Sequence, residues 1–132
     1  MGQNRASGAA ADRWGRATAR LIAHRLGATM RGSASNKATY EGRSVVFKAA
    51  ARATNHVGVT FNMLQTLEAI VAAFQLNDGS FEVWSLPTNV FLAKMKPTRS
   101  RGLPAGRVKL VPRSVFRSRG TLIGQIRLDR ST

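Results

Sequence analysis

Apolar residues recur at helical spacing near the start of the chain. The residues of this face are Trp14, Ala17, Thr18, Leu21 and Ile22, at positions i, i+3, i+4, i+7 and i+8. The spacing predicts an amphipathic helix from about residue 11 to residue 26, ended by Gly27. Residues 1–10, MGQNRASGAA, are expected to form a flexible arm ahead of this helix.

Further along, apolar and polar residues alternate as they do in half-buried strands. A short strand near residues 38–40, a turn at Glu41-Gly42 and a second strand over residues 43–50 (RSVVFKAA) predict a β-hairpin. Because side chains alternate along a strand, Val46 and Lys48 are expected to share one face.

A second hairpin has a stronger turn signal. The apolar segment EAIVAAFQL predicts a buried strand, Asn77-Asp78-Gly79 predicts a tight turn, and SFEVWSL predicts the returning strand. A short helix is expected over residues 88–95, and two short strands, GRVKLV and TLIGQIRL, near the C-terminus. Residues 52–60 are expected to be irregular, and residues 61–67 to form a short helix or to enter a strand.

This order of elements is typical of an α+β protein. We expect an N-terminal helix, two β-hairpins that form a mixed or antiparallel sheet, a short helix, and basic C-terminal strands or tail. The compact core is predicted to span residues 11–96, and residues 97–132 to form a basic C-terminal extension.

Composition narrows the class of protein. The chain has 132 residues, 43% of them hydrophobic, which suits one globular domain. The absence of cysteine excludes a disulfide scaffold and a thiolate zinc site. No apolar run reaches the roughly 18 residues of a membrane span. The Arg- and Ala-rich start resembles a transit peptide but has no secretory apolar segment, and a cytoplasmic location is expected.

Charge indicates the kind of partner. Lys and Arg number 21 against 6 Asp and Glu, a formal net charge of +15. The electric field of such a charge attracts polyanions, so we expect DNA or RNA as the partner. Binding to an anionic membrane surface is the weaker alternative, and no membrane partner is expected. A homo-oligomer or a larger assembly is also compatible with this charge.

Basic residues are the candidate contacts to phosphate. Arg13, Arg16, Arg20 and His24 form a stripe beside the apolar face of the predicted helix, which is either a solvated flank or a phosphate-contacting surface. The full set of candidate nucleic-acid-binding residues is Arg13, Arg16, Arg20, Arg31, Lys37, Lys48, Arg99, Arg101, Arg113, Arg117 and Arg119.

Motifs of common enzymes are missing from the sequence. It has no phosphate-binding glycine loop, no dinucleotide-binding GxGxxG and no GxSxG. His24 and His56 are the two histidines, and neither has a second ligand at metal-binding spacing. No metal site and no cofactor are therefore expected from these motifs.

The order of elements over about residues 14–92 resembles the PD-(D/E)xK phosphodiesterase fold of restriction endonucleases and related repair nucleases. The resemblance rests on a helix, a tight hairpin whose second strand ends in Lys48, and a second hairpin. It implies that Lys48 corresponds to the family lysine, which lies two residues after an acid and faces a divalent metal and the scissile phosphate. It also implies an earlier aspartate near residues 38–41, where the sequence has Glu41.

The sequence departs from that pattern at position 46, where Val46 stands in place of the acid. Mg²⁺ prefers carboxylate ligands, so the leading hypothesis is a nucleic-acid-binding protein with a catalytically inactive nuclease-like core. The second hypothesis is an active Mg²⁺-dependent nuclease that uses Glu41, Lys48 and a further acid such as Glu68. The third is a basic, non-enzymatic subunit of a ribonucleoprotein or phage assembly.

Overall fold

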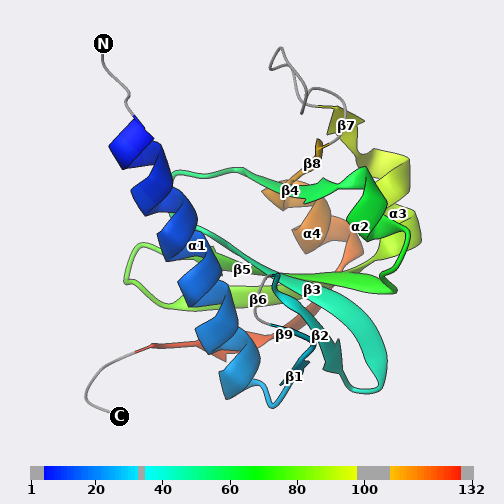
Figure 1. Ribbon diagram of the computed structural model, residues 1–132, viewed down its shortest axis with the longest axis horizontal. Helices are drawn as coiled ribbons and strands as arrows, with labels where there is room; N and C mark the ends of the chain where they lie inside the picture. Colours follow the sequence, from blue (N-terminus) through cyan, green and yellow to red (C-terminus); the bar gives the residue numbers. More distant parts are fainter. Residues whose placement is uncertain (1–4, 33–34, 98–107, 129–132) are drawn as a thin grey trace.

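The chain has an α+β fold with two β-sheets, seen in a computed structural model that describes residues 5–32, 35–97 and 108–128 (Figure 1). The helices in these residues are α1 (Arg5–Arg25), α2 (Phe61–Leu64), α3 (Thr88–Lys94) and α4 (Arg113–Arg119). The larger sheet contains, in spatial order, β1 (Thr29–Met30), β2 (Lys37–Tyr40), β3 (Arg43–Ala50), β5 (Ala69–Gln75), β6 (Phe81–Pro87) and β9 (Thr121–Ile126). The smaller sheet contains β4 (His56–Thr60), β8 (Val108–Pro112) and β7 (Lys96–Pro97).

Both predicted hairpins are present in the larger sheet. Strands β2 and β3 are antiparallel and joined by Glu41 (φ 52°) and Gly42 (φ 78°), the two positive φ angles of a type I′ turn. Strands β5 and β6 are antiparallel and joined by the turn that contains Gly79 (φ 88°). The hairpins meet through a parallel pairing of β3 with β5, so the sheet is mixed.

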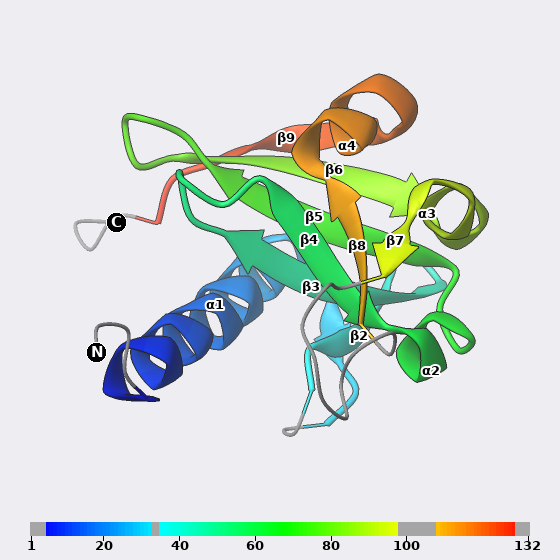
Figure 2. The same cartoon turned by 90° about the horizontal axis from the view of Figure 1, so that it is seen from above.

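The larger sheet is covered on both faces. On one face Ile22 and Ala23 of α1 pack against Phe47 and other buried residues of the central strands. On the other face the smaller sheet and α2, α3 and α4 enclose a second cluster that includes Val46 and Phe74. Figure 2 shows α1 apart from α2, α3 and α4. Burial on both sides explains why β5 is an almost unbroken apolar run.

The two strands expected near the C-terminus are present as β8 and β9, but the position of this segment in the fold differs from the expectation. Residues 108–128 are part of the core instead of a basic extension: β8 pairs with β4, and β9 pairs with β6. Val111 and Phe116 have no exposed surface, and Phe116 lies edge-on to Phe74 with ring centroids 5.4 Å apart. Helix α4 was not predicted from the sequence, because arginines surround its few apolar residues.

Two further boundaries also differ. The first helix begins at Arg5, so residues 5–10 of the expected arm are helical, while residues 1–4 lie outside the described residues. Residues 52–60 are only partly irregular, because His56–Thr60 forms β4. Residues 61–67 resolve in favour of a short helix, α2, whose first turn is capped by the Thr60 hydroxyl accepting from the amide of Met63 at 3.2 Å.

Candidate functional site

The second half of β3 lies along an open edge of the larger sheet. Its partner β2 is short, and the ladder ends at the pair Lys37 and Val46, followed by a bond from the amide of Phe47 to the carbonyl oxygen of Asn36 at 3.0 Å. Beyond that point α1 lies beside β3, and a Cβ placed on Gly15 would be 3.8 Å from the carbonyl oxygen of Ala49. Because β2 begins only at Lys37, it does not cover the second half of β3, and this leaves room for a hollow next to Lys48.

Two adjoining cavities occupy this hollow and share Arg16, Asn36 and Lys48 in their lining; we call them together the α1–β4 cleft. The first has a volume of about 330 Å³ and extends across Lys48 to Gly58 of β4. The second has a volume of about 180 Å³ and adds Arg20 of α1. Residues of α1, β3 and β4 that are far apart in sequence thus line one continuous cleft.

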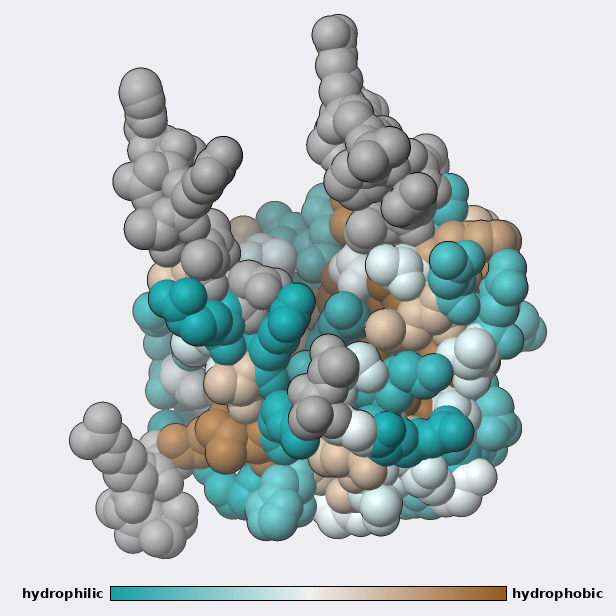
Figure 3. Space-filling model, viewed as in Figure 1, coloured by the Kyte–Doolittle hydropathy of each residue, from teal (hydrophilic) through white to brown (hydrophobic). Residues whose placement is uncertain are grey.

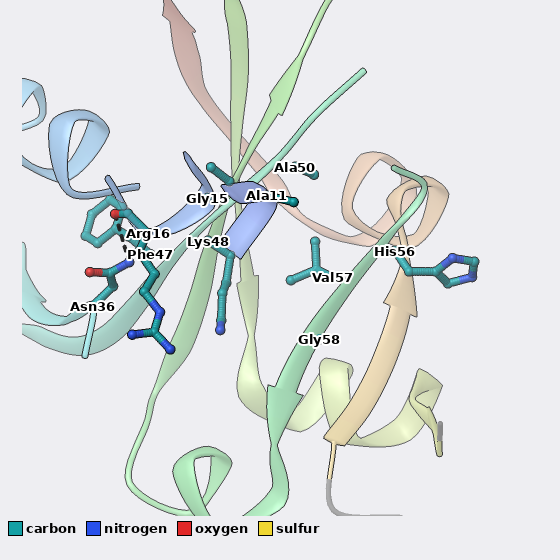
Figure 4. A pocket seen from close by; sticks show the side chains of 11 residues that line it. Ala11, Gly15, Arg16, Asn36, Phe47, Lys48, Ala50, His56, Val57 and Gly58 are labelled. Atoms are coloured by element: carbon teal, nitrogen blue, oxygen red, sulfur yellow. Dashed lines mark hydrogen bonds between the residues drawn. The ribbon is translucent and has the colours of Figure 1, made fainter. Parts of the chain in front are cut away.

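The cleft has a basic rim. The described residues that line it include the basic side chains of Arg16, Arg20 and Lys48 and no carboxylate. Figure 4 shows Arg16 and Lys48 extending to the same side between α1 and β4, while His56 turns away from them. In Figure 3, hydrophilic residues border the hollow beside α1.

Hydrogen bonds connect α1 with the segment before β2 at the rim. The side-chain amide of Asn36 donates to the carbonyl oxygen of Arg16 at 3.3 Å. The guanidinium of Arg20 donates to the carbonyl oxygens of Gly32 at 3.4 Å and Ser35 at 3.5 Å. These contacts join α1 to the segment that precedes β2.

The strand alternation that the sequence predicts is confirmed at Val46 and Lys48, which line the same cavity. Val46 is 1% exposed and belongs to the cluster beneath the smaller sheet. An isopropyl group therefore occupies the position two residues before Lys48, and it cannot ligate a metal ion.

The candidate acids lie at the opposite end of β3. Glu41 is in the turn that precedes Arg43, and Lys48 is five residues beyond Arg43, roughly 16 Å along a strand. Glu68 lies near that turn as well, since its carboxylate accepts from the amide of Ser44 at 3.1 Å. The structure does not bring Glu41 or Glu68 together with Lys48. Within the described residues, no three His, Asp or Glu side chains are placed to hold a metal ion.

The candidate phosphate contacts of α1 divide into two groups. Arg16 and Arg20 line the α1–β4 cleft, whereas Arg13 and His24 are exposed and do not line it. Helical spacing alone placed these four residues in one stripe. Only the position at which α1 crosses β3 separates them.

Arg31 and Lys37 do not line the cleft. The guanidinium of Arg31 donates to the hydroxyl of Ser44 at 2.8 Å. Lys37 is half-buried on β2, beside Val46.

The candidates in the C-terminal segment do not form a common surface with the cleft. Arg113 donates to the carbonyl oxygens of Ala51, Arg52 and Thr54, and Arg117 forms an ion pair with Glu82 at 3.1 Å. Arg119 is exposed at the end of α4. Arg99 and Arg101 lie outside the described residues.

The wall of the cleft opposite α1 was missed from the sequence. His56, Val57 and Gly58 of β4 form it, together with Met63 of α2 in the second cavity. The alternation in HVGVT was the signal that could have identified this strand. Its pairing partner β8 lies about fifty residues further along the chain, which no local pattern reveals.

No helix in the described part of the chain is long and apolar enough to cross a membrane. Comparison with known proteins found no matching family model, no curated relative and no similar solved structure.

Proposed function

We propose that this protein binds nucleic acid through the phosphate backbone and that the α1–β4 cleft is its principal contact surface. The observation that carries the proposal is the convergence of Arg16, Arg20 and Lys48, from two separate elements, on one cleft. Phosphate contacts by Lys and Arg release condensed counterions, which drives binding without base recognition. The net charge of +15 adds long-range attraction for the same partner.

Binding without cleavage is the form of this function that the geometry favours. Phosphodiester hydrolysis of the PD-(D/E)xK type uses a divalent metal to polarise phosphate and activate water. In this chain Val46 occupies the position of the neighbouring acid, and Glu41 and Glu68 lie at the other end of β3. The convergence of a lysine and two arginines on one cleft suits the binding of a phosphate better than the binding of a metal ion.

A salt titration of affinity tests the binding proposal. Labelled DNA and RNA are titrated with protein, and binding is followed by fluorescence anisotropy at NaCl concentrations between about 50 and 200 mM. If the protein makes six to ten phosphate contacts, its affinity should fall about 10³–10⁵-fold over this range of salt. Lys48→Gln is expected to weaken binding and reduce the slope of log K against log salt by about 0.7–0.9. Arg119→Gln removes the same charge from an exposed site away from the cleft and is the matched control.

Two results would count against the proposal. One is the absence of binding at low salt. The other is an equal loss of affinity in Lys48→Gln and Arg119→Gln, which would make binding a property of total charge and not of the cleft.

Incubation of the protein with labelled DNA or RNA and with Mg²⁺ or Mn²⁺ tests catalysis, and both nucleic acids are expected to stay intact. Metal-dependent cleavage that disappears in Lys48→Ala would instead establish an active nuclease.

A further inference from the structure

Trp14 is unusually exposed for a large aromatic residue on a helix that packs against a sheet. Its side chain is 38% exposed, and its ring centroid lies 6.3 Å from that of Phe81 at an interplanar angle of 31°. Contact with Phe81 supports the indole on one side. The indole is thus held by the fold while a substantial part of its surface remains open.

A third cavity of about 420 Å³ lies beside this indole. Its lining includes Trp14, Thr54 and Gln75. It shares Ala11 and Gly15, both labelled in Figure 4, with the first cavity of the α1–β4 cleft, and it also shares the end of β3 with it. The cleft therefore continues around α1 to Trp14, and we call the whole surface the α1 track.

The α1 track changes in chemistry along its length. Arg16, Arg20 and Lys48 surround the part within the α1–β4 cleft, whereas mostly apolar surface and an aromatic ring surround the part at Trp14. Ala11 and Gly15 of α1 line both parts, so the cationic and aromatic parts adjoin one another along α1. A ligand that fits both parts carries negative charge and planar apolar groups on one flexible chain.

Single-stranded nucleic acid has this combination of groups. Its phosphates bind to basic side chains, and its unpaired bases stack on aromatic rings regardless of sequence. In a duplex the bases are paired and stacked on one another, so their faces cannot reach an indole at the side of a helix. Two of the cavities along the track, of about 330 and 420 Å³, fall within the usual size range of ligand pockets.

We propose that the α1 track binds single-stranded nucleic acid in preference to duplex, with phosphates on Arg16 and Lys48 and an unpaired base stacked on Trp14. This inference rests on the proposed function and adds the class of nucleic acid and an aromatic contact to it. Trp14 is a binding residue in this arrangement, and Phe81 supports its ring.

Selective loss of single-strand affinity tests the stacking contact. Trp14→Leu is expected to lower affinity for an unstructured oligothymidine about tenfold, which corresponds to the loss of one stacked base, and to leave duplex affinity nearly unchanged. Trp14→Phe keeps an aromatic face and should recover most of the loss. Leu21→Ala is the matched control, since Leu21 is an exposed apolar residue of the same helix at 54% exposure.

Fluorescence gives a second measurement that does not depend on the folding of the Trp14 variants. The chain has two tryptophans, and Trp84→Phe leaves Trp14 as the single indole reporter. Saturating oligothymidine should quench its emission strongly, whereas a matched duplex should quench it little.

The possible results separate the two proposals. If neither single strand nor duplex binds at low salt, the proposed function itself is wrong. If both bind equally, with Trp14→Leu unchanged and no quenching of Trp14, the protein binds nucleic acid but the single-strand inference is overturned. Equal losses for single strand and duplex in Trp14→Leu would likewise overturn it, because stacking would then not be the cause.

Discussion

Arg113 illustrates how a basic residue of a basic chain can serve the fold. Its guanidinium donates to the carbonyl oxygens of Ala51 at 3.2 Å and Thr54 at 2.8 Å and lies 4.8 Å from the ring centroid of Phe74. Burial, and to a lesser degree the charge of Arg117, lowers the pKa of Arg113. This arginine joins α4 to the loop that follows β3.

Replacement of Arg113 should therefore affect stability. Arg113→Gln is expected to reduce the free energy of unfolding by about 1–3 kcal/mol, because hydrogen bonds from a charged donor to backbone carbonyl groups are lost. Urea denaturation followed by circular dichroism measures this. Arg119→Gln, at an exposed site, is expected to stay within about 0.5 kcal/mol of the parent. Equal stability of the two variants would show that the Arg113 contacts contribute nothing.

The sequence placed Arg113 among the phosphate contacts because nothing near it indicates its partners. The carbonyl groups that it contacts precede it by 59 to 62 residues. For Arg16 and Arg20 the helical pattern correctly predicted a shared face, but it also included Arg13, which does not line the cleft. Whether a given arginine lines the cleft or supports the fold depends on which helices and strands pack beside it, and composition carries no information about that packing.

At the scale of elements, the β5–β6 hairpin is held by contacts around Asp78. The Asp78 carboxylate accepts from the amide of Ser80 at 2.9 Å and from its hydroxyl at 2.6 Å, and it pairs with Arg127 of the segment after β9 at 3.1 Å. The Ser80 hydroxyl bond is the largest of the causes that lower the pKa of Asp78. The charged form of Asp78 is thus favoured in the folded protein.

This shift makes the hairpin sensitive to acid. A carboxyl group whose pKa is depressed by folding contributes stability above its unfolded pKa of about 3.9, and this contribution disappears as pH falls through the folded pKa. Between pH 6 and about pH 2 we therefore expect the parent to lose more stability than Asp78→Ala. Urea titrations at several pH values measure the difference, and carbon-detected NMR follows the Asp78 carboxyl directly. In Ser80→Ala the pKa of Asp78 should move back toward its ordinary value; an unchanged pKa would contradict the assigned cause.

Both hairpins could be predicted because their signals are local. Glu41-Gly42 and Asn77-Asp78-Gly79 each lie between two segments predicted to be strands. Each turn joins two strands that follow one another in the sequence and pair with each other. For strand β4 the alternation in HVGVT was a local signal, but its pairing with β8, about fifty residues further along the chain, had none. The parallel contact of β3 with β5 was equally inaccessible, since it is fixed by the burial of both faces of β5.

At the scale of the whole molecule, the excess positive charge acts on stability as well as on binding. A net charge of +15 on 132 residues makes the folded state repel itself. Salt screens this repulsion, with a Debye length of about 10 Å at 0.1 M. A bound polyanion neutralises it directly, and it also stabilises the folded state by mass action.

Melting temperatures should report both effects. In the absence of ligand, Tm is expected to rise as NaCl is increased from about 20 to 300 mM, because screening reduces the repulsion. At low salt a saturating oligonucleotide should raise Tm further, with a stabilisation of about 2.7 kcal/mol at a hundred times Kd. That increment should vanish at high salt, where phosphate contacts are weak. Calorimetry measures both, and a Tm that falls with NaCl in the free protein would contradict the role given to self-repulsion.

The long separation between β4 and β8 along the chain has a consequence for biosynthesis. Val57 of β4 pairs with Val111 of β8, so a growing chain must be extended by 54 residues before this pairing can form. At about 5–20 residues per second, that interval lasts roughly 3–10 s. During it the nascent chain holds the apolar face of β4 without its partner strand, a state that is open to chaperones and to aggregation. Until Val111 has been synthesised, the wall that β4 contributes to the α1–β4 cleft lacks its partner strand.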